Sequence, residues 1–193
     1  MSRIIKLPEP DMEGKMPLEK AIAQRRSCRD FLDEQLTKDQ MGQLCWSAQG
    51  KVGRFKTVPS AGAMYPLEVF AASMDGLFHY LPDGHCLEEL TAEDIRGKIM
   101  AAAWGQEFIK QAGATFVIAA EFERTTGRYG QRGVRYVYME AGHAAQNIHL
   151  EAEALGLGSV AVGAFNDEEV SEVLKLSGKL EPLYMVVVGR CKK

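Results

Sequence analysis

Apolar residues recur every three or four positions between residues 133 and 155, which predicts the longest helix of the chain. The repeating positions are Val134, Val137, Tyr138, Ala141, Ala145, Ile148, Ala152 and Leu155. Three of these residues are alanine, so another helix can approach this face closely. Gly156-Leu157-Gly158 follows directly and is expected to end the helix, because glycine readily adopts the left-handed conformation of a C-cap.

Shorter helices are predicted from their caps. Pro17 opens one near the N-terminus, because the first helical turn does not use the N–H that proline lacks, and it ends near Arg25. Thr37 and Gln40 have the spacing of a capping box, and Gly50 stops the helix that follows them. Further helices are expected from Thr91 to about Ala102, over about Gln106 to Gln111, and after Asn166, which caps the last helix together with Glu169.

Short apolar runs between turn residues predict the strands. Asp75-Gly76 separates two of these runs and predicts a hairpin. The expected strands are Leu67–Ser73, Leu77–Tyr80, Ala114–Phe122, Ser159–Val162 and Leu183–Val188. Because most of the strands are scattered between helices, the pattern predicts an α+β fold.

Three segments are expected to lack regular structure. Residues 1–15 are predicted to form an irregular N-terminal arm, and residues 51–66 a loop rich in glycine and proline. Residues 123–132 are polar and are expected to form a loop that lines a pocket.

Composition narrows the class of protein. The chain has 193 residues, of which 46% are hydrophobic, and this suits one domain spanning residues 1–193. A net charge of −3 gives no support to nucleic-acid binding. No apolar run reaches the roughly 18 residues of a membrane span, and no secretory signal is recognised, so we expect a cytoplasmic protein that binds no membrane. The four cysteines have no metal-binding spacing and are expected to be reduced thiols.

A cluster of three guanidinium groups and one hydroxyl lies just after the first predicted helix. It consists of Arg25, Arg26, Ser27 and Arg29. The cations repel one another unless an anion lies among them, and arginine binds phosphate through forked hydrogen bonds. The segment is therefore a candidate phosphate site. A solvated turn with a surface salt bridge to Asp30 or Glu34 is the alternative.

Three further features are candidates for ligand binding. Pro59–Glu68 sets small residues between two prolines, which gives a stiff loop that a flat ring can approach. Gly163 and Ala164 follow a strand and precede a capped helix, so their N–H groups can point at a ligand. Arg190 follows the last strand and can close over a phosphate. An ordinary loop, an ordinary turn and a surface arginine are the respective alternatives.

Other arrangements lack a partner that their chemistry requires. Glu140 and His143 lie one helical turn apart, but a di-iron site needs a second such pair and two more glutamates. Ser60 with His143 lacks a G-x-S-x-G elbow and an acid behind the histidine. No G-x-G-x-x-G follows a strand, so no Rossmann dinucleotide site is expected. We therefore expect no metal and assign no catalytic side chain.

Together, four segments resemble the FMN-dependent nitroreductase family, most closely its branch of SagB-type and McbC-like dehydrogenases, which oxidise azoline rings in modified peptides. The segments are Arg25–Phe31, Pro59–Glu68, Glu140–Asn147, and Gly163–Phe165 with Gly189-Arg190. They occur in family order and span residues 17–190. The resemblance implies a nitroreductase-like fold, with a central, mostly antiparallel sheet flanked by helices, in a homodimer built around the helix of residues 133–155.

The resemblance also implies roles for single residues. For the FMN phosphate and ribityl chain they are Arg25, Arg26, Ser27 and Arg29, with Arg190 reaching the same phosphate. For the isoalloxazine ring they are Pro59, Ser60, Ala61 and Ala63 from the other protomer, Gln106 at the polar edge, and the backbone N–H groups of Gly163 and Ala164 at N5 and O4. Tyr65, Arg124, Arg128 and Tyr129 are expected at the mouth of the substrate site. Only three residues follow Arg190, so the 1–15 arm is expected to wrap the partner in place of a C-terminal strand.

The activity implied is an FMN-dependent oxidoreductase that takes hydride from NADH or NADPH and reduces small nitro, quinone or enone compounds in a ping-pong cycle. Flavin chemistry needs no side-chain nucleophile, which agrees with the absence of a triad. Three alternatives stay open. They are an azoline dehydrogenase acting on a peptide-derived ring, a non-catalytic flavin-binding protein, and an interaction protein whose arginines form only a surface patch.

Overall fold

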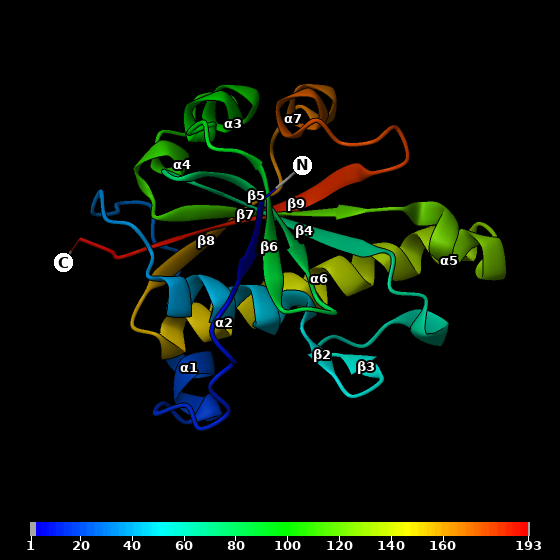
Figure 1. The fold of residues 1–193 in the computed structure, drawn as a ribbon, viewed down its shortest axis with the longest axis horizontal. Coiled ribbons are helices and arrows are strands. Elements are labelled where there is room, and N and C mark those ends of the chain that lie inside the picture. The colour runs from blue at the N-terminus through cyan, green and yellow to red at the C-terminus, as the bar shows by residue number, and fades with distance from the viewer. Residues whose placement is uncertain (1–2, 193) are drawn as a thin grey trace.

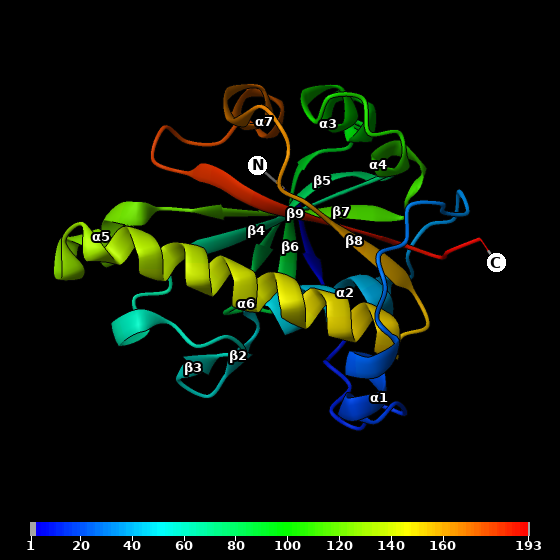
Figure 2. The ribbon, with the colours of Figure 1, turned by 180° about the vertical axis from the view of Figure 1, so that it is seen from behind.

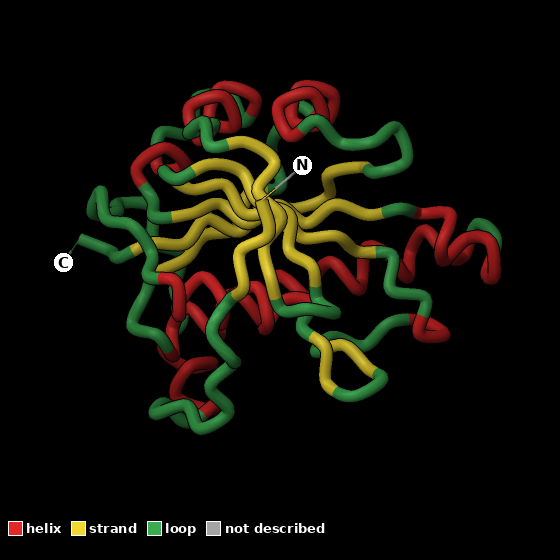
Figure 3. The backbone as a smooth tube through the Cα atoms, in the orientation of Figure 1, coloured by secondary structure: helices red, strands yellow, loops and turns green. Residues whose placement is uncertain are grey.

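A seven-stranded sheet forms the centre of the computed structural model, which describes residues 3–192 (Figures 1 and 3). The strand order is β1-β6-β5-β4-β7-β9-β8, and every neighbouring pair is antiparallel. The strands are β1 (Arg3–Lys6), β4 (Leu67–Ser73), β5 (Gly76–Leu81), β6 (Cys86–Thr91), β7 (Ala114–Ala120), β8 (Gly158–Val162) and β9 (Glu181–Gly189). The expectation of an α+β fold with a flanked antiparallel sheet is confirmed.

Helices cover both faces of the sheet, and each face has its own apolar core. On the lower face in Figure 1 lie α1 (Leu18–Gln24), α2 (Lys38–Gln49) and the long α6 (Arg132–Ala154). On the upper face lie α3 (Arg96–Ala102), α4 (Phe108–Gln111) and α7 (Asp167–Leu174). Figure 2 shows α6 running the full width of the sheet, with α5 (Phe122–Tyr129) leading into it. No helix in the described range is long and apolar enough to cross a bilayer.

The caps and the apolar periodicity were reliable guides to most elements. The Oγ1 of Thr37 accepts the N–H of Gln40, whose side chain accepts the N–H of Thr37 in return, so the capping box is present. The Asn166 side chain accepts the N–H of Glu169, as expected for the N-cap of α7. The expected strand Leu67–Ser73 is β4, residue for residue. The long helix is displaced by a single residue at each end.

Two of the expected loops contain regular structure. Residues 123–132, expected as a loop, form most of α5 and the start of α6, separated by Gly130 at φ 55°. The helix is supported by an ion pair one turn apart, between Glu121 and Arg124. Residues 51–66 contain a small hairpin of β2 (Lys51–Val52) and β3 (Phe55–Lys56), followed by the 3-10 turn η1 (Ala61–Ala63). Thr91 does not cap a helix but ends β6, a strand that the sequence analysis missed.

The chain ends also differ from expectation. Within the arm of residues 1–15, the segment Arg3–Lys6 is not irregular but forms an edge strand that pairs with β6 of its own sheet, and wrapping of a partner by the arm stays a prediction. Residues 1–2 lie outside the described range. The prediction of four reduced thiols was also wrong. Cys28 and Cys191 form a disulfide, whereas Cys45 and Cys86 are free and buried. Cys28 and Cys191 are 163 positions apart in the sequence, so their pairing could be found only from the fold.

Candidate functional site

The arginine-rich segment after α1 lies on the first residues of β8. The N–H of Cys28 donates to the carbonyl of Ser159 at 3.0 Å, and Ser27 forms a parallel bridge with the same residue. Beneath this contact, Nδ1 of His149 in α6 lies 2.7 Å from Oγ of Ser159. The sheet and α6 therefore fix the position of the segment.

Arg190 reaches this segment from the far end of the chain. The carbonyl of Arg190 accepts the N–H of Leu32 at 2.8 Å, and the disulfide links the next residue, Cys191, to Cys28. We call Arg25, Arg26, Ser27, Arg29 and Arg190 the cationic corner. The structure thus brings together residues that lie more than 160 positions apart, as the sequence analysis expected.

The charge of the cationic corner is largely uncompensated. Within the described residues, neither Arg25 nor Arg29 has a carboxylate within 4.0 Å, and Arg26 donates to the carbonyls of Ala23 and its own neighbour Arg25. The two acids nearby are already paired, Asp30 with Lys192 at 2.9 Å and Glu34 with Arg190 at 3.4 Å. The alternative of a salt bridge from the 25–29 segment to either acid therefore does not hold here.

Residues 163–164 follow β8 directly. Starting from Ser159, the strand leads to Gly163 over four residues, or about 13 Å at the usual rise. Gly163 and Ala164 are both exposed. The side-chain amide of Gln106 donates to the carbonyl of Ala164 at 3.0 Å, so the loosely matched Gln106 does lie beside the segment that the sequence analysis assigned to the same ligand edge.

The proline loop, Pro59–Pro66, has an unusual backbone. Gly62, Ala63 and Tyr65 have φ of 60°, 55° and 48°. Left-handed geometry costs an ordinary residue roughly 1–2 kcal/mol, so this shape must be held by its surroundings. The N–H of Tyr65 donates to Oγ of Ser60 at 2.8 Å. The result is a stiff loop whose Pro59 and Ala63 are exposed and whose Ser60 and Ala61 are half-buried.

The residues expected at a substrate mouth differ in what their side chains contact. Arg124 braces the proline loop, because its guanidinium donates to the carbonyl of Tyr65 at 3.2 Å and to Glu68 at 2.6 Å. The hydroxyl of Tyr129 lies against Gly62, where a Cβ on that glycine would be 2.6 Å away. Arg128 is exposed and stacks over the ring of Tyr129, at 5.6 Å from its centroid. Arg124 is therefore held by the proline loop and Glu68, whereas Arg128 is exposed and lies against Tyr129.

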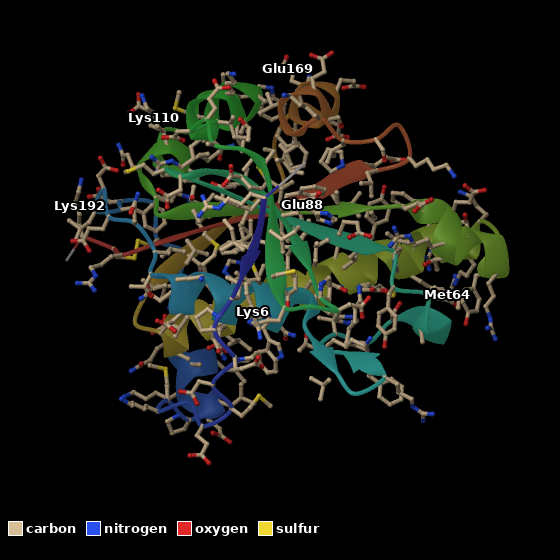
Figure 4. The ribbon with its side chains drawn as sticks, in the orientation of Figure 1. Lys6, Met64, Glu88, Lys110, Glu169 and Lys192 are labelled. Atoms are coloured by element: carbon tan, nitrogen blue, oxygen red, sulfur yellow. A yellow bond between two sulfur atoms is a disulfide. The ribbon has the colours of Figure 1, made fainter. Side chains whose placement is uncertain are left out.

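The proline loop and the cationic corner lie at different ends of α6 in one chain. The loop faces Tyr136, Glu140 and His143, whereas the corner lies over His149. Nine residues of helix separate Glu140 from His149, which is about 14 Å. In Figure 4, Met64 of the proline loop and Lys192, near the corner, lie on opposite sides of the molecule. One protomer therefore does not bring the two expected halves of the site together.

A family comparison decides what kind of protein has this arrangement. The family model described as the nitroreductase family matches residues 22–190. The chain belongs to the nitroreductase family. The expectation of an oxidoreductase enzyme of this family is therefore confirmed.

Relatives of this nitroreductase-family chain agree. A putative nitroreductase of Methanocaldococcus jannaschii is 43% identical over 189 residues, covering 94% of each chain. The microcin B17-processing protein McbC of Escherichia coli is 27% identical over 68% of this chain and 53% of its own length. An FMN reductase [NAD(P)H] of Bacillus subtilis is 26% identical over 88% of this chain and 64% of its own.

Solved structures share the nitroreductase-family fold. A putative nitroreductase from Ralstonia eutropha superposes with a TM-score of 0.88 at 32% identity, over 99% of this chain and 90% of that one. The E. coli microcin synthetase McbBCD complex with truncated pro-MccB17 contains a chain that superposes with a TM-score of 0.77 at 22% identity, over 97% of this chain and 78% of that one. The second likeness shows the fold alone.

The sequence analysis rejected Glu140 as a metal ligand and included it in the segment Glu140–Asn147 that resembles the family, but it gave this residue no place in the site of the nitroreductase-family fold. Glu140 is 3% exposed, and burial raises its pKa to about 7, although the nearby Ser60 hydroxyl, the Gln49 amide and the charge of Lys56 oppose this shift. Among the described residues, Glu140 Oε1 and both amide atoms of Gln49 are buried without a well-formed hydrogen bond. A carboxylate three residues after Val137, on the apolar face of the helix, was the signal in the sequence.

Proposed function

We propose that the protein binds FMN and uses it to pass hydride from NADH or NADPH to a small nitro, quinone or enone compound. The observation that carries this proposal is the cationic corner of a nitroreductase-family chain, in which Arg25 and Arg29 lack carboxylate partners among the described residues and the backbone brings Arg190 to the same segment from the C-terminal end. This donor set fits a phosphate dianion, and each charge-assisted hydrogen bond contributes about 1.5–3 kcal/mol.

The ring would lie beyond the phosphate, along β8. Exposed Gly163 and Ala164 offer backbone N–H groups there, and Gln106 holds the Ala164 carbonyl so that this backbone keeps its orientation. Bound FMN supplies the hydride-carrying N5, and N–H donors at N5 and O4 stabilise the charge that develops on reduction. Arg128 and Tyr129 would border the position of the second substrate.

Completion of the site requires a second copy of the chain. The proline loop lies about 14 Å along α6 from the corner, so a partner's loop would cover the ring. Large apolar side chains on α1 and α6 support such an interface, since they are more than half exposed in one protomer. They are Leu18, Ile22, Tyr138 and Met139. We expect a two-fold dimer by light scattering, and a monomer that holds FMN tightly would contradict the shared site.

The experiment that tests this function is identification of the bound chromophore. We expect a yellow protein that releases FMN on heating, as identified by mass, and that loses its colour when NADH or NADPH is added without oxygen. A protein that takes up no FMN when incubated with an excess would overturn the proposal. If the colour persists with both nicotinamides, NADH and NADPH are not the hydride donors.

The match to McbC favours one alternative substrate class, a peptide-derived azoline ring. That reading predicts slow reduction by nicotinamides, oxidation of an azoline substrate and dependence on a second protein. Fast nicotinamide turnover by the isolated protein would count against it. The cytoplasmic location stays a prediction from the sequence.

A further inference from the structure

Glu140 holds the proline loop from behind. The carboxyl group projects from α6 into a hollow of about 250 Å³ lined by Ser60, Tyr136 and His143 among others. Its neighbour Gln49 comes from α2 and is 1% exposed, so Glu140 and Gln49 together form a buried polar pair at the edge of the core. Among the described residues, four buried side chains carry a polar atom without a hydrogen-bond partner, and two of them, Glu140 and Gln49, lie here. A buried carboxyl with an unused oxygen calls for a role other than packing.

The hydroxyl of Ser60 links this carboxyl to the exposed side of the loop. Oγ of Ser60 accepts the N–H of Tyr65 at 2.8 Å, and Ser60 shares the wall of the hollow with the Glu140 carboxyl, whose pKa its hydroxyl lowers. A hydroxyl has a single proton, and an ionised carboxylate can only accept. When Glu140 is ionised, Ser60 must therefore direct its proton inward. When Glu140 is protonated, it can donate to Oγ instead, and the Ser60 proton becomes free to point outward.

Both forms of Glu140 are accessible near neutral pH. Burial raises the pKa of the carboxyl to about 7, and the ammonium of Lys56 opposes that rise. Burial lowers the pKa of Lys56 itself, and Glu68 opposes that shift. The groups that face the carboxyl are Lys56 from β3, Ser60 from the proline loop, Gln49 from α2, and Tyr136 and His143 from α6.

We propose that Glu140 is a positioning residue whose protonation turns Ser60 from an inward hydrogen bond to an outward donor aimed at an acceptor of the flavin ring. This inference rests on the proposed function, because the ring is the ligand that would receive the donor. By linkage, FMN then binds more tightly to the protonated form, and FMN binding promotes proton uptake by Glu140.

The test is the affinity of the apoprotein for FMN between pH 6 and pH 8.5, followed by quenching of FMN fluorescence. In the wild-type protein we expect the dissociation constant to rise by roughly three- to tenfold as pH passes through 7, the effect of one neutral hydrogen bond. Ionisation of the FMN phosphate, with a pKa of ~6, is common to all variants and cancels in their comparison.

Three variants separate the causes. Glu140→Gln keeps a donor permanently on Ser60, so it should bind FMN across the whole range with the affinity of the low-pH wild type. Ser60→Ala should bind weakly and lack the change near pH 7. His143→Asn, a second titratable neighbour in the same hollow, should keep the wild-type profile.

Proton uptake gives a second readout that a purely structural role would not alter. Calorimetric binding at pH 7 in two buffers of different ionisation enthalpy should show uptake of part of a proton by the wild type, and less by Glu140→Gln. Parallel affinity profiles for these two proteins, or equal uptake, would overturn the role of Glu140 while leaving FMN binding intact. A wild-type apoprotein that binds no FMN at any pH would overturn both this inference and the proposed function.

Discussion

Nδ1 of His149 lies 2.7 Å from Oγ of Ser159, and this hydrogen bond joins α6 to the strand on which the cationic corner lies. The imidazole is 7% exposed, and burial together with the charge of Arg25 lowers its pKa to about 4. His149 is therefore neutral in the folded protein at neutral pH. It supports the corner without adding a further positive charge.

This pKa predicts how acid affects folding stability. Between pH 6.5 and pH 4 the unfolded chain binds a proton at residue 149 and the folded protein does not, so stability is lost as the pH falls, by up to about 3 kcal/mol. The His149→Asn variant lacks this loss. Urea unfolding should show its free energy of unfolding rising relative to wild type from pH 6.5 to pH 4. A constant difference across that range would contradict the assignment.

Glu140 predicts the opposite slope. Its folded-state pKa of about 7 lies above the usual glutamate value of 4.5, so its contribution to stability is complete below pH 4.5 and is lost as the pH rises through 7. Glu140→Gln should match wild type near pH 4.5 and exceed it at pH 8 by up to about 3 kcal/mol in the free energy of unfolding. The measurement is urea unfolding at both values. A variant less stable than wild type at pH 8 would argue against a buried, ionised carboxylate.

Loss of the proposed phosphate contacts should remove the cofactor. Arg25→Ala combined with Ser27→Ala deletes a guanidinium and a hydroxyl donor, and we expect FMN affinity to fall by at least a hundredfold, because charge-assisted bonds contribute about 1.5–3 kcal/mol each. The readout is flavin absorbance per protein after gel filtration, with the melting temperature with and without added FMN. Arg3→Ala, on the opposite sheet edge, is the control and should stay yellow. Stoichiometric FMN in the double variant would place the phosphate elsewhere.

Gly158 should tolerate no side chain. A Cβ at this position would overlap the Cys191 sulfur and would lie 2.7 Å from Cβ of Cys28. Gly158→Ala is expected to lower the free energy of unfolding by about 1–3 kcal/mol or to expose free thiols, measured by urea unfolding and thiol titration. Gly97→Ala, in α3 with nothing within 4 Å, is the matched control and should be neutral or stabilising. Equal behaviour of the two variants would refute the close approach.

Local patterns predicted the parts of the fold that depend on neighbouring residues. The stripe of α6 and the Thr37 and Asn166 caps involve contacts within a few positions, and all three are present. The prediction for β1 was wrong because this edge strand is held by backbone pairing with β6 and is mostly exposed, so its sequence carries no apolar pattern. The prediction of a loop over residues 123–132 was wrong because a polar composition does not exclude a helix, and α5 is stabilised by the ion pair between Glu121 and Arg124.

The candidate site divides in the same way. Arginine spacing indicated the 25–29 half of the cationic corner, because repulsion between nearby charges is visible in sequence. Arg190 lies beside this segment because Cys191 pairs with Cys28 across 163 positions, a contact that no local pattern encodes. Arg124 was expected at a substrate mouth, but its guanidinium is bound to Glu68 and to the Tyr65 carbonyl. Only the fold shows which charges are already paired.

The disulfide also determines how the molecule would respond to mechanical force. Cys28 and Cys191 enclose nearly all of the sheet, so tension applied at the two ends of the chain would pass through the S–S bond and bypass β4 to β9. Pulling could then extend only the segment before Cys28, by detaching β1 and unwinding α1. Under reducing conditions the same tension would reach the whole sheet, and the released contour length would grow several-fold.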